Sequence, residues 1–461
     1  MDGMSETPLL RVNSVSVTKL FGIYDHSISL RVDERVTIIH GPNGVGKTVI
    51  LKLLAALFSG RLHEFGRVPL ERFEVQLTDG TTISVSAEEF RAQGRRGIGP
   101  SSILRLTVAE NGREPLTADF DLNPPNGLWE RLLALQAVPL LEQMDADDEI
   151  DSVPKQLAME ADRLRRRAEA MVTGTHLQQK RRFLEKEPKW FPAIRHRVNV
   201  HIIETQRLLR LAPSDTVSLP QMASAMVPTV RDYAKDLQGR VTETLARYAS
   251  VSQSLDQSFP QRLLRARTTE LSIADIKARM AELDAKRAKL KSIGLLDDNA
   301  AYPFDITSLD NLDGTQRSVM TLYVQDTAQK LGVLDDLSRR VELLRDNVNG
   351  KFKHKSIKFD RDNGFTASGV DGRLLDLDAL SSGEQHELVL LYDLLFRVQP
   401  NTLVLIDEPE LSLHVLWQKR FLPDLLEIVQ TAKFDALVAT HSPFIVGSHH
   451  DLMVALSSED E

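Results

Sequence analysis

Short, nearly continuous apolar runs occur near both ends of the chain, at residues 36–40, 403–406 and 436–439. Runs of this length and composition are typical of strands buried on both faces of a mostly parallel sheet. Residues 198–203, in the middle of the chain, alternate apolar and polar residues and are expected to form a strand that returns to the same sheet. The pattern therefore predicts an α/β fold whose central sheet takes strands from both ends of the chain.

Alternating apolar and polar positions predict a second, antiparallel group of strands. Residues 9–20 and 27–32 alternate in this way and lead into the run at 36–40. Two later pairs of runs flank Asp79-Gly80 and Asn111-Gly112, dipeptides that favour tight hairpin turns. A further hairpin is expected around Asn363-Gly364, at residues 352–370. The first two hairpins predict an antiparallel β subdomain close to the N-terminus.

Apolar residues in the middle of the chain recur at steps of three and four. The clearest sets lie within residues 237–255, 273–290 and 334–348. Such spacing is the seam of packed helices. Pro260 and residues 297–310 are expected to divide the region into helices of about 20–28 residues, or roughly 30–42 Å. We therefore predict a short helical or coiled-coil insert rather than a long arm.

These patterns divide the chain into three parts. Residues 1–127 and 351–461 are expected to form the two halves of one α/β head. Residues 128–350 form the mainly helical insert, with one strand returning to the head near residues 198–206. With 461 residues, the chain is long enough for two or three lobes.

Composition excludes several classes of function. The chain has no cysteine, which excludes disulfides, thiol catalysis and cysteine-ligated zinc and suits a cytoplasmic protein. No signal peptide and no apolar run of the roughly 18 residues needed to span a bilayer are found, so no membrane partner is expected. The net charge of −8 means that any DNA binding must use a local basic patch. Arg165, Arg166 and Arg167 mark the best such patch, although an ordinary solvated helix face is the favoured explanation for them over contact with DNA, RNA or a partner.

A phosphate-binding loop follows the first apolar run. It consists of Gly41, Pro42, Asn43, Gly44, Val45, Gly46, Lys47 and Thr48. The pattern G-x-x-x-x-G-K-[ST] between a strand and a helix lets backbone N–H groups surround phosphates. Lys47 would reach the outer phosphates, and the Thr48 hydroxyl can ligate magnesium. The alternative is an ordinary glycine turn before a helix.

Asp407 and Glu408 follow the run at 403–406, at the strand end where ligands of open α/β sheets bind. Asp407 is the candidate partner of magnesium, and Glu408 is the candidate that polarises the attacking water. His441 follows the run at 436–439 and could touch the γ-phosphate. The alternative is a pair of solvated acids and a structural histidine.

A second small-residue loop precedes a helical run at residues 384–396. Ser381, Ser382, Gly383 and Glu384 could offer hydroxyl and N–H groups to a phosphate at the helix N-terminus. A helix cap formed by Ser381 or Ser382, with Glu384 in the first turn, would show the same pattern.

In their order along the chain and in their residues, these motifs resemble those of the ABC-type ATPase heads of the SMC, Rad50 and RecF class. They are most similar to prokaryotic "AAA family ATPase" proteins like the ATPase half of the OLD family. By this resemblance, residues 41–48 correspond to Walker A, residues 380–385 to the signature, residues 402–408 to Walker B, residues 411–414 to the D-loop and His441 to the switch histidine. Gln206 is the candidate for the Q-loop glutamine, with a surface glutamine as its alternative.

The resemblance implies a P-loop NTPase that binds ATP and Mg²⁺ as a head-to-head homodimer, each signature loop completing its partner's site. It also suggests a role as sensor or regulator in bacterial anti-phage defence, working with an effector nuclease in trans. The alternative is a RecF- or Rad50-like DNA repair ATPase that binds DNA directly. A further alternative is a binding module that retains its nucleotide without turnover.

Overall fold

The computed structural model of the protein describes residues 10–90, 101–121, 188–203, 209–211, 226–265, 271–296, 312–412 and 415–456. Within these residues, both ends of the chain contribute strands to a five-stranded sheet in the order β16-β3-β15-β14-β8. All of its pairings are parallel. The strands are β3 (Val36–His40), β8 (Asn199–Ile203), β14 (Thr402–Asp407), β15 (Asp435–Thr440) and β16 (Met453–Ala455). The predicted parallel sheet and its four expected strands are confirmed.

A second sheet has six antiparallel strands in the order β2-β1-β4-β5-β6-β7. Its strands are β1 (Val12–Leu20), β2 (Tyr24–Ser29), β4 (Arg72–Leu77), β5 (Thr82–Phe90), β6 (Ser101–Ala109) and β7 (Leu116–Asp121). Gly80 and Gly112 sit in the turns of the two predicted hairpins with φ of 86° and 76°. Because glycine adopts positive φ without steric cost, both turns form where the sequence predicts them.

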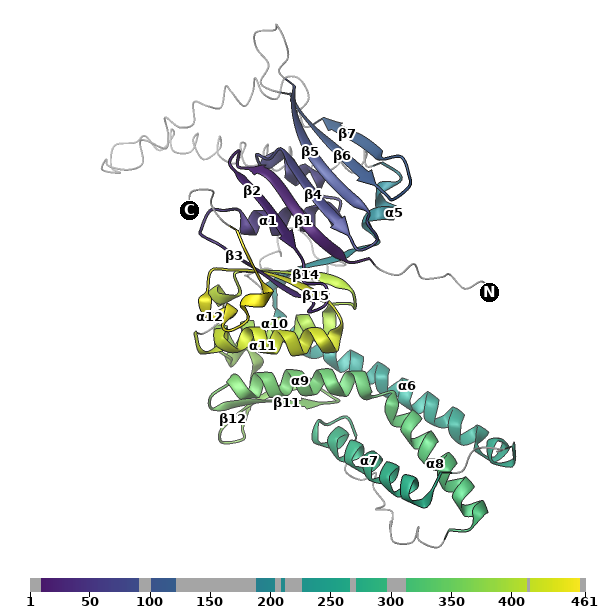
Figure 1. Ribbon diagram of the computed structural model, residues 1–461. Helices are drawn as coiled ribbons and strands as arrows, with labels where there is room; N and C mark the ends of the chain where they lie inside the picture. The colour runs from purple at the N-terminus through teal and green to yellow at the C-terminus, as the bar shows by residue number, and fades with distance from the viewer. Residues whose placement is uncertain are drawn as a thin grey trace, which may run out of the picture.

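The parallel sheet separates two hydrophobic cores. Leu405 and Leu437 face the first core, which includes helix α1 (Lys47–Phe58) and the antiparallel sheet. Val404 and Val438 face the second core, which is formed with the later helices. Since neighbouring residues of a strand point to opposite faces, the continuous apolar runs fill both cores. Figure 1 shows the resulting layers, with the antiparallel sheet and α1 on one side of the parallel strands and α10 and α11 on the other.

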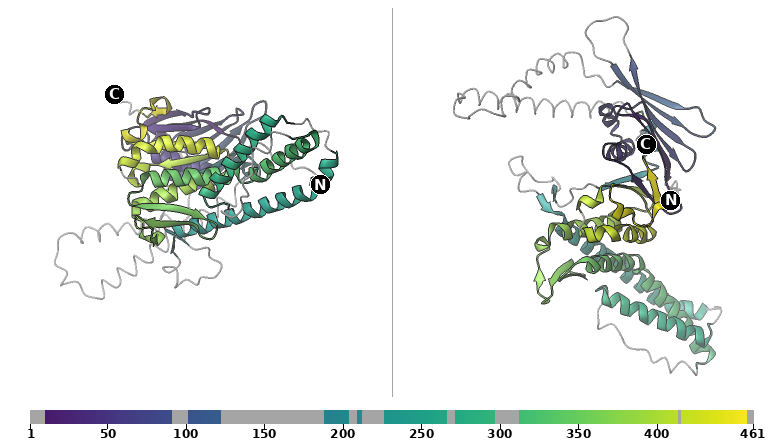
Figure 2. Two further views of the ribbon diagram at one scale, coloured as in Figure 1. Left: turned by 90° about the horizontal axis from the view of Figure 1, so that it is seen from below. Right: turned by 60° about the vertical axis from the view of Figure 1, so that its left-hand side comes forward.

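The remaining described elements are mostly helical. The helices are α5 (Phe191–Arg195), α6 (Thr229–Arg265), α7 (Ile273–Ser292), α8 (Gly314–Gly332), α9 (Asp335–Lys351), α10 (Ser382–Tyr392), α11 (Val415–Ala432) and α12 (Pro443–Val446). The short strands are β9 (Leu209–Leu211), β10 (Met226–Pro228), β11 (Lys355–Asp360), β12 (Gly364–Gly369) and β13 (Leu374–Leu375). Helices α6, α7 and α8 form an arm that projects from the layered part of the molecule (Figures 1 and 2). The periodic apolar sets predict α6, α7 and α9 correctly, whereas the sequence reasoning did not identify α8.

Helix α6 is 37 residues long and continues through Pro260, so the prediction that Pro260 divides the helix is wrong. Proline removes one backbone hydrogen bond and crowds the preceding turn. In that turn, Ser258 Oγ donates to the carbonyl of Ser254, and Arg262 Nη2 donates to the carbonyl of Leu255. These side-chain bonds add contacts to the turn before Pro260 but do not replace the lost bond, which would have gone to the Asp256 carbonyl. The helix nevertheless continues to Arg265.

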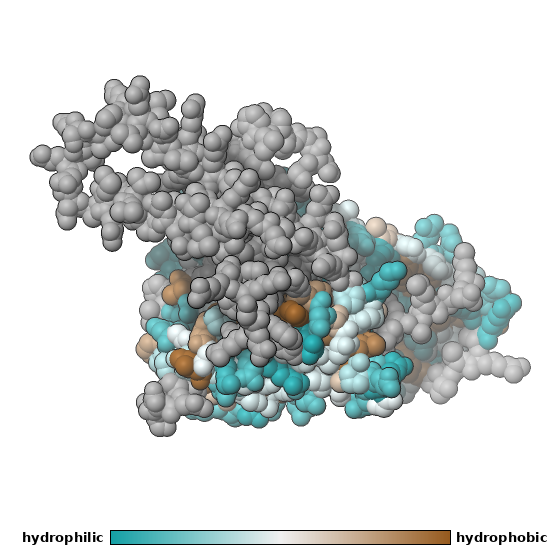
Figure 3. Space-filling view, turned by 90° about the horizontal axis from the view of Figure 1, so that it is seen from above, coloured by the Kyte–Doolittle hydropathy of each residue, from teal (hydrophilic) through white to brown (hydrophobic). Residues whose placement is uncertain are grey.

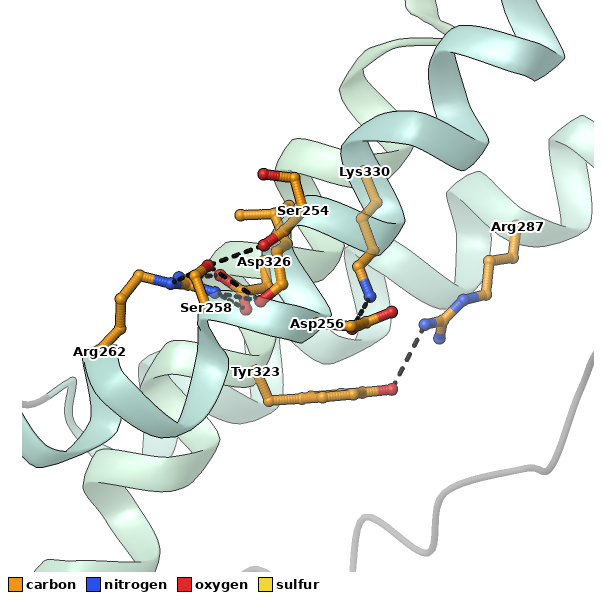
Figure 4. Close-up of polar contacts among 9 residues, drawn as sticks. Ser254, Asp256, Ser258, Arg262, Arg287, Tyr323, Asp326 and Lys330 are labelled. Carbon is orange, nitrogen blue, oxygen red and sulfur yellow. Dashed lines mark hydrogen bonds and ion pairs between the residues drawn. The ribbon is translucent and has the colours of Figure 1, made fainter.

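The arm helices are tied together by ion pairs, shown in Figure 4. Both guanidinium nitrogens Nη1 and Nη2 of Arg262 donate to the Asp326 carboxylate of α8, each at 2.6 Å. Lys330 pairs with Asp256 at 2.6 Å, which joins the same two helices nearby. A two-pronged contact on a carboxylate fixes direction as well as distance, so these pairs set how α8 lies against the end of α6.

Helix α10 is held between α6 on one side and α9 and α11 on the other. On one side, Tyr233 of α6 donates to Asp393, which directly follows α10. On the other side, the Lys351 ammonium of α9 contacts Glu387 of α10 and Asp424 of α11, and all three side chains are at least 90 % buried. Removing Lys351 would deprive two buried carboxylates of the cation that they share, so the packing of α9, α10 and α11 is closely specified.

Some sequence predictions lie outside the described residues. These are the Q-loop candidate Gln206, the basic patch at Arg165, Arg166 and Arg167, and part of the D-loop at residues 413–414. On the coloured part of the face in Figure 3, hydrophilic residues separate small hydrophobic groups. Among the helices of the described ranges, none is both long and apolar enough to cross a bilayer.

Candidate functional site

The phosphate-binding loop joins β3 to α1, as the sequence predicts. Gly44 and Gly46 have φ of 89° and 95°, a conformation that favours glycine. A Cβ atom on Gly46 would lie 2.3 Å from Leu20 Cδ2, so the close packing of β1 on the loop also requires glycine there. The loop is further supported by the buried His26, whose Nε2 lies 2.9 Å from the carbonyl oxygen of Val45. Sequence reasoning did not identify His26, which carries no motif.

Lys47, at the start of α1, curls back over its own loop. Its ammonium donates to the carbonyl oxygens of Gly41 and Pro42, both at 2.8 Å. Its third contact is His441 Nδ1, at 3.2 Å. The three donors of the ammonium therefore all have acceptors, and the lysine lies where the loop surrounds a phosphate.

The end of β14 brings the first Walker B acid to the loop. Thr48 Oγ1 donates to Asp407 Oδ1 at 3.0 Å, across 359 residues of sequence. The contact follows from the topology, because β3 and β14 both pair with β15 in parallel and end at the same edge of the sheet. The structure thus brings together the two residues that the sequence assigns to magnesium.

Glu408 and His441 face each other at the same edge. Glu408 Oε1 lies 3.4 Å from His441 Nε2. An ammonium group only donates, so Nδ1 accepts from Lys47, and the ring proton is placed on Nε2, toward Glu408. Glu408 has a φ of 43°, unusual for a residue with a side chain, and such conformations concentrate at functional sites. The three side chains form a chain of contacts from the loop lysine to the second Walker B acid.

A third acid, Glu410, completes the group and was not identified from the sequence. Its Oε1 accepts from Thr440 Oγ1 and from the backbone N–H of His441, both at 2.8 Å. Gln418 of α11 reaches the same turn, donating to the Glu410 carbonyl at 3.3 Å. The only available signal was its place in the segment Asp407-Glu-Pro-Glu410, directly after the strand.

Burial shifts the proton affinities of two of these groups. Burial raises the pKa of Asp407 above its ordinary value, and the negative charges of Glu408 and Glu410 add to the rise; the Thr48 hydrogen bond opposes it. Burial lowers the pKa of Lys47, against the attraction of nearby carboxylates led by Glu408. Opposite charges gathered in a partly desolvated site are typical of functional centres.

The signature segment makes its contacts on its own helix. Ser381 Oγ accepts from the Glu384 N–H at 3.4 Å, and Glu384 Oε2 accepts from the Ser381 N–H at 2.7 Å, a reciprocal helix cap. Glu384 also pairs with Lys355 at 2.8 Å. The Ser382 side chain is exposed, and Gly383 lies beside it in the first turn. Within the described residues, no hydrogen bond or ion pair links residues 381–384 to residues 41–48 of the same chain.

The oxygen atoms of this site fit a hard divalent cation whose remaining ligands are supplied by a nucleotide and by water. Thr48 and Asp407 supply a hydroxyl and a carboxylate oxygen, the ligand types that magnesium prefers. In the part of the chain that the structure describes, no group of three or more acidic or histidine side chains is placed to hold a metal. Magnesium usually takes one or two protein ligands together with phosphates and waters, which matches this pair.

A cavity of about 430 Å³ borders the site between α1 and β8. Asp407 and Lys52 of α1 are among its lining residues, which also include Ile202 and Ile203. Lys52 carries its positive charge close enough to Asp407 to oppose the rise in that residue's pKa. Asp407 can therefore be approached from the α1 side.

Two comparisons with known proteins find similarities. Residues 245–447 match the family described as "AAA domain, putative AbiEii toxin, Type IV TA system". The solved structures include an SMC head domain from Thermotoga maritima, with 12% identity, a TM-score of 0.33 and coverage of 96% of this chain and 94% of that chain. They also include the Smc head domain with an extended coiled coil, bound to the C-terminal domain of ScpA, from Pyrococcus furiosus, with 13% identity, a TM-score of 0.34 and coverage of 98% and 94%.

Among curated proteins, no sequence matches this chain. The family match spans the signature segment, both Walker B acids and His441, and begins after the phosphate-binding loop. In the structure, the loop is joined to that span by the contacts of Lys47 and Thr48. Residues 245–447 are therefore similar to an AAA domain, and the phosphate-binding loop lies against that part of the chain.

Proposed function

We propose that this protein binds ATP with Mg²⁺ at the edge of its parallel sheet and hydrolyses it. The observation that supports this most directly is the contact between Thr48 and Asp407 at 3.0 Å. It joins a phosphate-binding loop to the first acid of a Walker B strand. A glycine turn with a purely structural role would not require a partly buried carboxylate at that place.

The residues of the site have separate roles in the proposed reaction. Backbone N–H groups of residues 44–48 and the N-terminus of α1 bind the phosphates. Lys47 leaves the carbonyls of its own loop for the outer phosphates, and Thr48 and Asp407 hold the metal, which offsets phosphate charge when bound. Glu408 orients the attacking water and accepts its proton, while His441 lies where it can contact the γ-phosphate.

The proposed active form is a dimer of heads. Ser382 is exposed and Ser381 and Glu384 cap their own helix, so the signature segment presents its free donors outward. The N-terminus of α10 there carries partial positive charge. In the proposed arrangement, Ser382 and Gly383 of one copy contact the γ-phosphate held by Lys47 of the other.

We further propose a role in bacterial anti-phage defence, as a sensor or regulator that controls an effector nuclease in trans. The family that matches residues 245–447 is described as a putative toxin of a toxin–antitoxin system, which supports a defence setting. Affinity purification from the native host should recover a nuclease with the ATPase; purification without any companion protein would contradict this role.

The test of the enzymatic proposal is Glu408→Gln. The variant should bind ATP with unchanged affinity, because the loop is intact, but lose turnover by about 100-fold or more, since the base is absent. It should also remain a dimer in the presence of ATP. Steady-state phosphate release, direct ATP titration and sedimentation measure these three quantities.

Glu427→Gln is the matched control, because Glu427 is an exposed glutamate of α11. It should behave as the parent protein does. Parent-level hydrolysis by Glu408→Gln would show that Glu408 is not the base. A parent protein that retains ATP without turnover would instead indicate a binding module.

A further inference from the structure

Glu410 occupies a turn that returns the chain to the site. Glu408 still donates its N–H to the Ala439 carbonyl at 2.9 Å, so it continues the pairing of β14 with β15. Its positive φ then reverses the chain into a short 3-10 turn, Pro409–Ser412. This reversal directs the Glu410 side chain to the end of β15, directly before His441.

The carboxylate of Glu410 joins the ends of two strands. One oxygen, Oε1, accepts from the Thr440 hydroxyl and from the His441 N–H. Thr440 is fully buried, and its Oγ1 accepts in turn from the Ser442 N–H at 2.9 Å. Three consecutive residues, 440–442, are thus held by one carboxylate and one hydroxyl.

We infer that Glu410 is a positioning residue for His441, an inference that rests on the proposed ATPase function. The His441 ring must reach Lys47 on one side and Glu408 on the other, at 3.2 and 3.4 Å. A ring can keep two such contacts only if its backbone is fixed. Glu410 supplies that restraint from the turn after Walker B.

A rival explanation is that Glu410 acts through its charge. Its other oxygen, Oε2, is buried without a hydrogen-bond partner. Its negative charge also affects both Lys47 and Asp407. A positioning role requires only the two accepted hydrogen bonds, which a neutral amide oxygen can also accept. Glu410→Gln therefore separates the two explanations, because its amide nitrogen can replace the oxygen that lacks a partner.

The kinetic test compares Glu410→Ala with Glu410→Gln. Glu410→Ala should lower kcat, on the order of 100-fold if His441 moves by about 1 Å, with little change in ATP affinity. Glu410→Gln should recover most of the lost turnover. Parent-like kcat in the alanine variant, or equal loss in both variants, would overturn the positioning role. Glu427→Ala, at an exposed site on α11, is the control for altered surface charge.

A second measurement does not depend on hydrolysis. In the nucleotide-free protein, amide hydrogen exchange at His441 should be faster in Glu410→Ala than in the parent, because the N–H loses its acceptor. Exchange at Val438, in the middle of β15, should stay the same, which also shows that the variant is folded. If exchange at His441 were the same in Glu410→Ala as in the parent, the inference would be refuted, even if the parent hydrolysed ATP. If exchange were faster in Glu410→Ala but the parent showed no turnover, the positioning of His441 would be supported and the proposed ATPase function refuted.

Discussion

At the scale of single residues, the site gathers three carboxylates around one lysine. Such a group is costly to desolvate, and the raised pKa of Asp407 shows the direction of that cost. Residues that bind a ligand commonly lower the stability of the folded protein. The charged Asp407 should therefore lower the free energy of unfolding of the nucleotide-free protein.

Asp407→Asn should raise the free energy of unfolding at pH 7, by roughly 0.5–2 kcal/mol, while abolishing the Mg²⁺ dependence of ATP binding. An acid whose folded-state pKa is raised destabilises the folded protein above that pKa and ceases to do so below its unfolded value. The gain should therefore shrink as the pH falls from 7 toward 4. Chemical denaturation across this range measures it.

The exposed Asp33 provides the control substitution, Asp33→Asn, which should leave stability nearly unchanged at each pH. A gain from Asp407→Asn that grew as the pH fell would show that the carboxylate stabilises the folded protein.

At the scale of elements, Arg262 ties α6 to α8 beyond the point where Pro260 disturbs the helix. Arg262→Ala should destabilise the protein by about 1–2 kcal/mol, because Asp326, with 8% of its side chain exposed, loses its partner. Exposure of a third of the Arg262 side chain keeps the effect at this level. Thermal unfolding measures the change.

Arg265→Ala removes an exposed arginine from the end of the same helix and should have little effect. Adding Asp326→Asn to Arg262→Ala should recover part of the loss. If the double variant were less stable than Arg262→Ala alone, the buried charge would not be the cause.

The elements also show what local pattern can and cannot predict. The strands around the site were predictable because each is a short apolar run ending in a residue with recognisable chemistry, such as Asp407 or His441. The passage of α6 through Pro260 was not predictable, because proline usually ends or kinks a helix and the ion pair that holds this end of α6 joins Arg262 to Asp326, which is distant in sequence. Glu410 was missed because its role depends on the reversal of the chain at Glu408, where φ is positive, and the sequence pattern does not predict that conformation.

At the scale of the whole molecule, the proposed site is shared between two copies. A mixture of two inactive variants tests this. Lys47→Ala removes the loop lysine, and Ser382→Arg blocks the signature segment. A mixed dimer should contain one site with both defects and one site with neither.

Equal amounts of the two variants should therefore hydrolyse ATP at about a quarter of the parent rate, since half the dimers are mixed and each has one intact site of two. Each variant alone should be inactive. No recovery on mixing, with mixed dimers verified by differential tagging, would place all catalytic parts within a single copy.

The central sheet has a consequence for how the protein is made. Strand β3 lies between β15 and β16, and Thr48 meets Asp407 across 359 residues. At the usual 5–20 residues per second, the ribosome takes on the order of a minute to synthesise that interval. During this time the edges of β3 are unpaired, because the strands that pair with them, β15 and β16, have not yet been synthesised. The nascent protein thus depends on its C-terminal strands both to cover those edges and to complete the proposed nucleotide site.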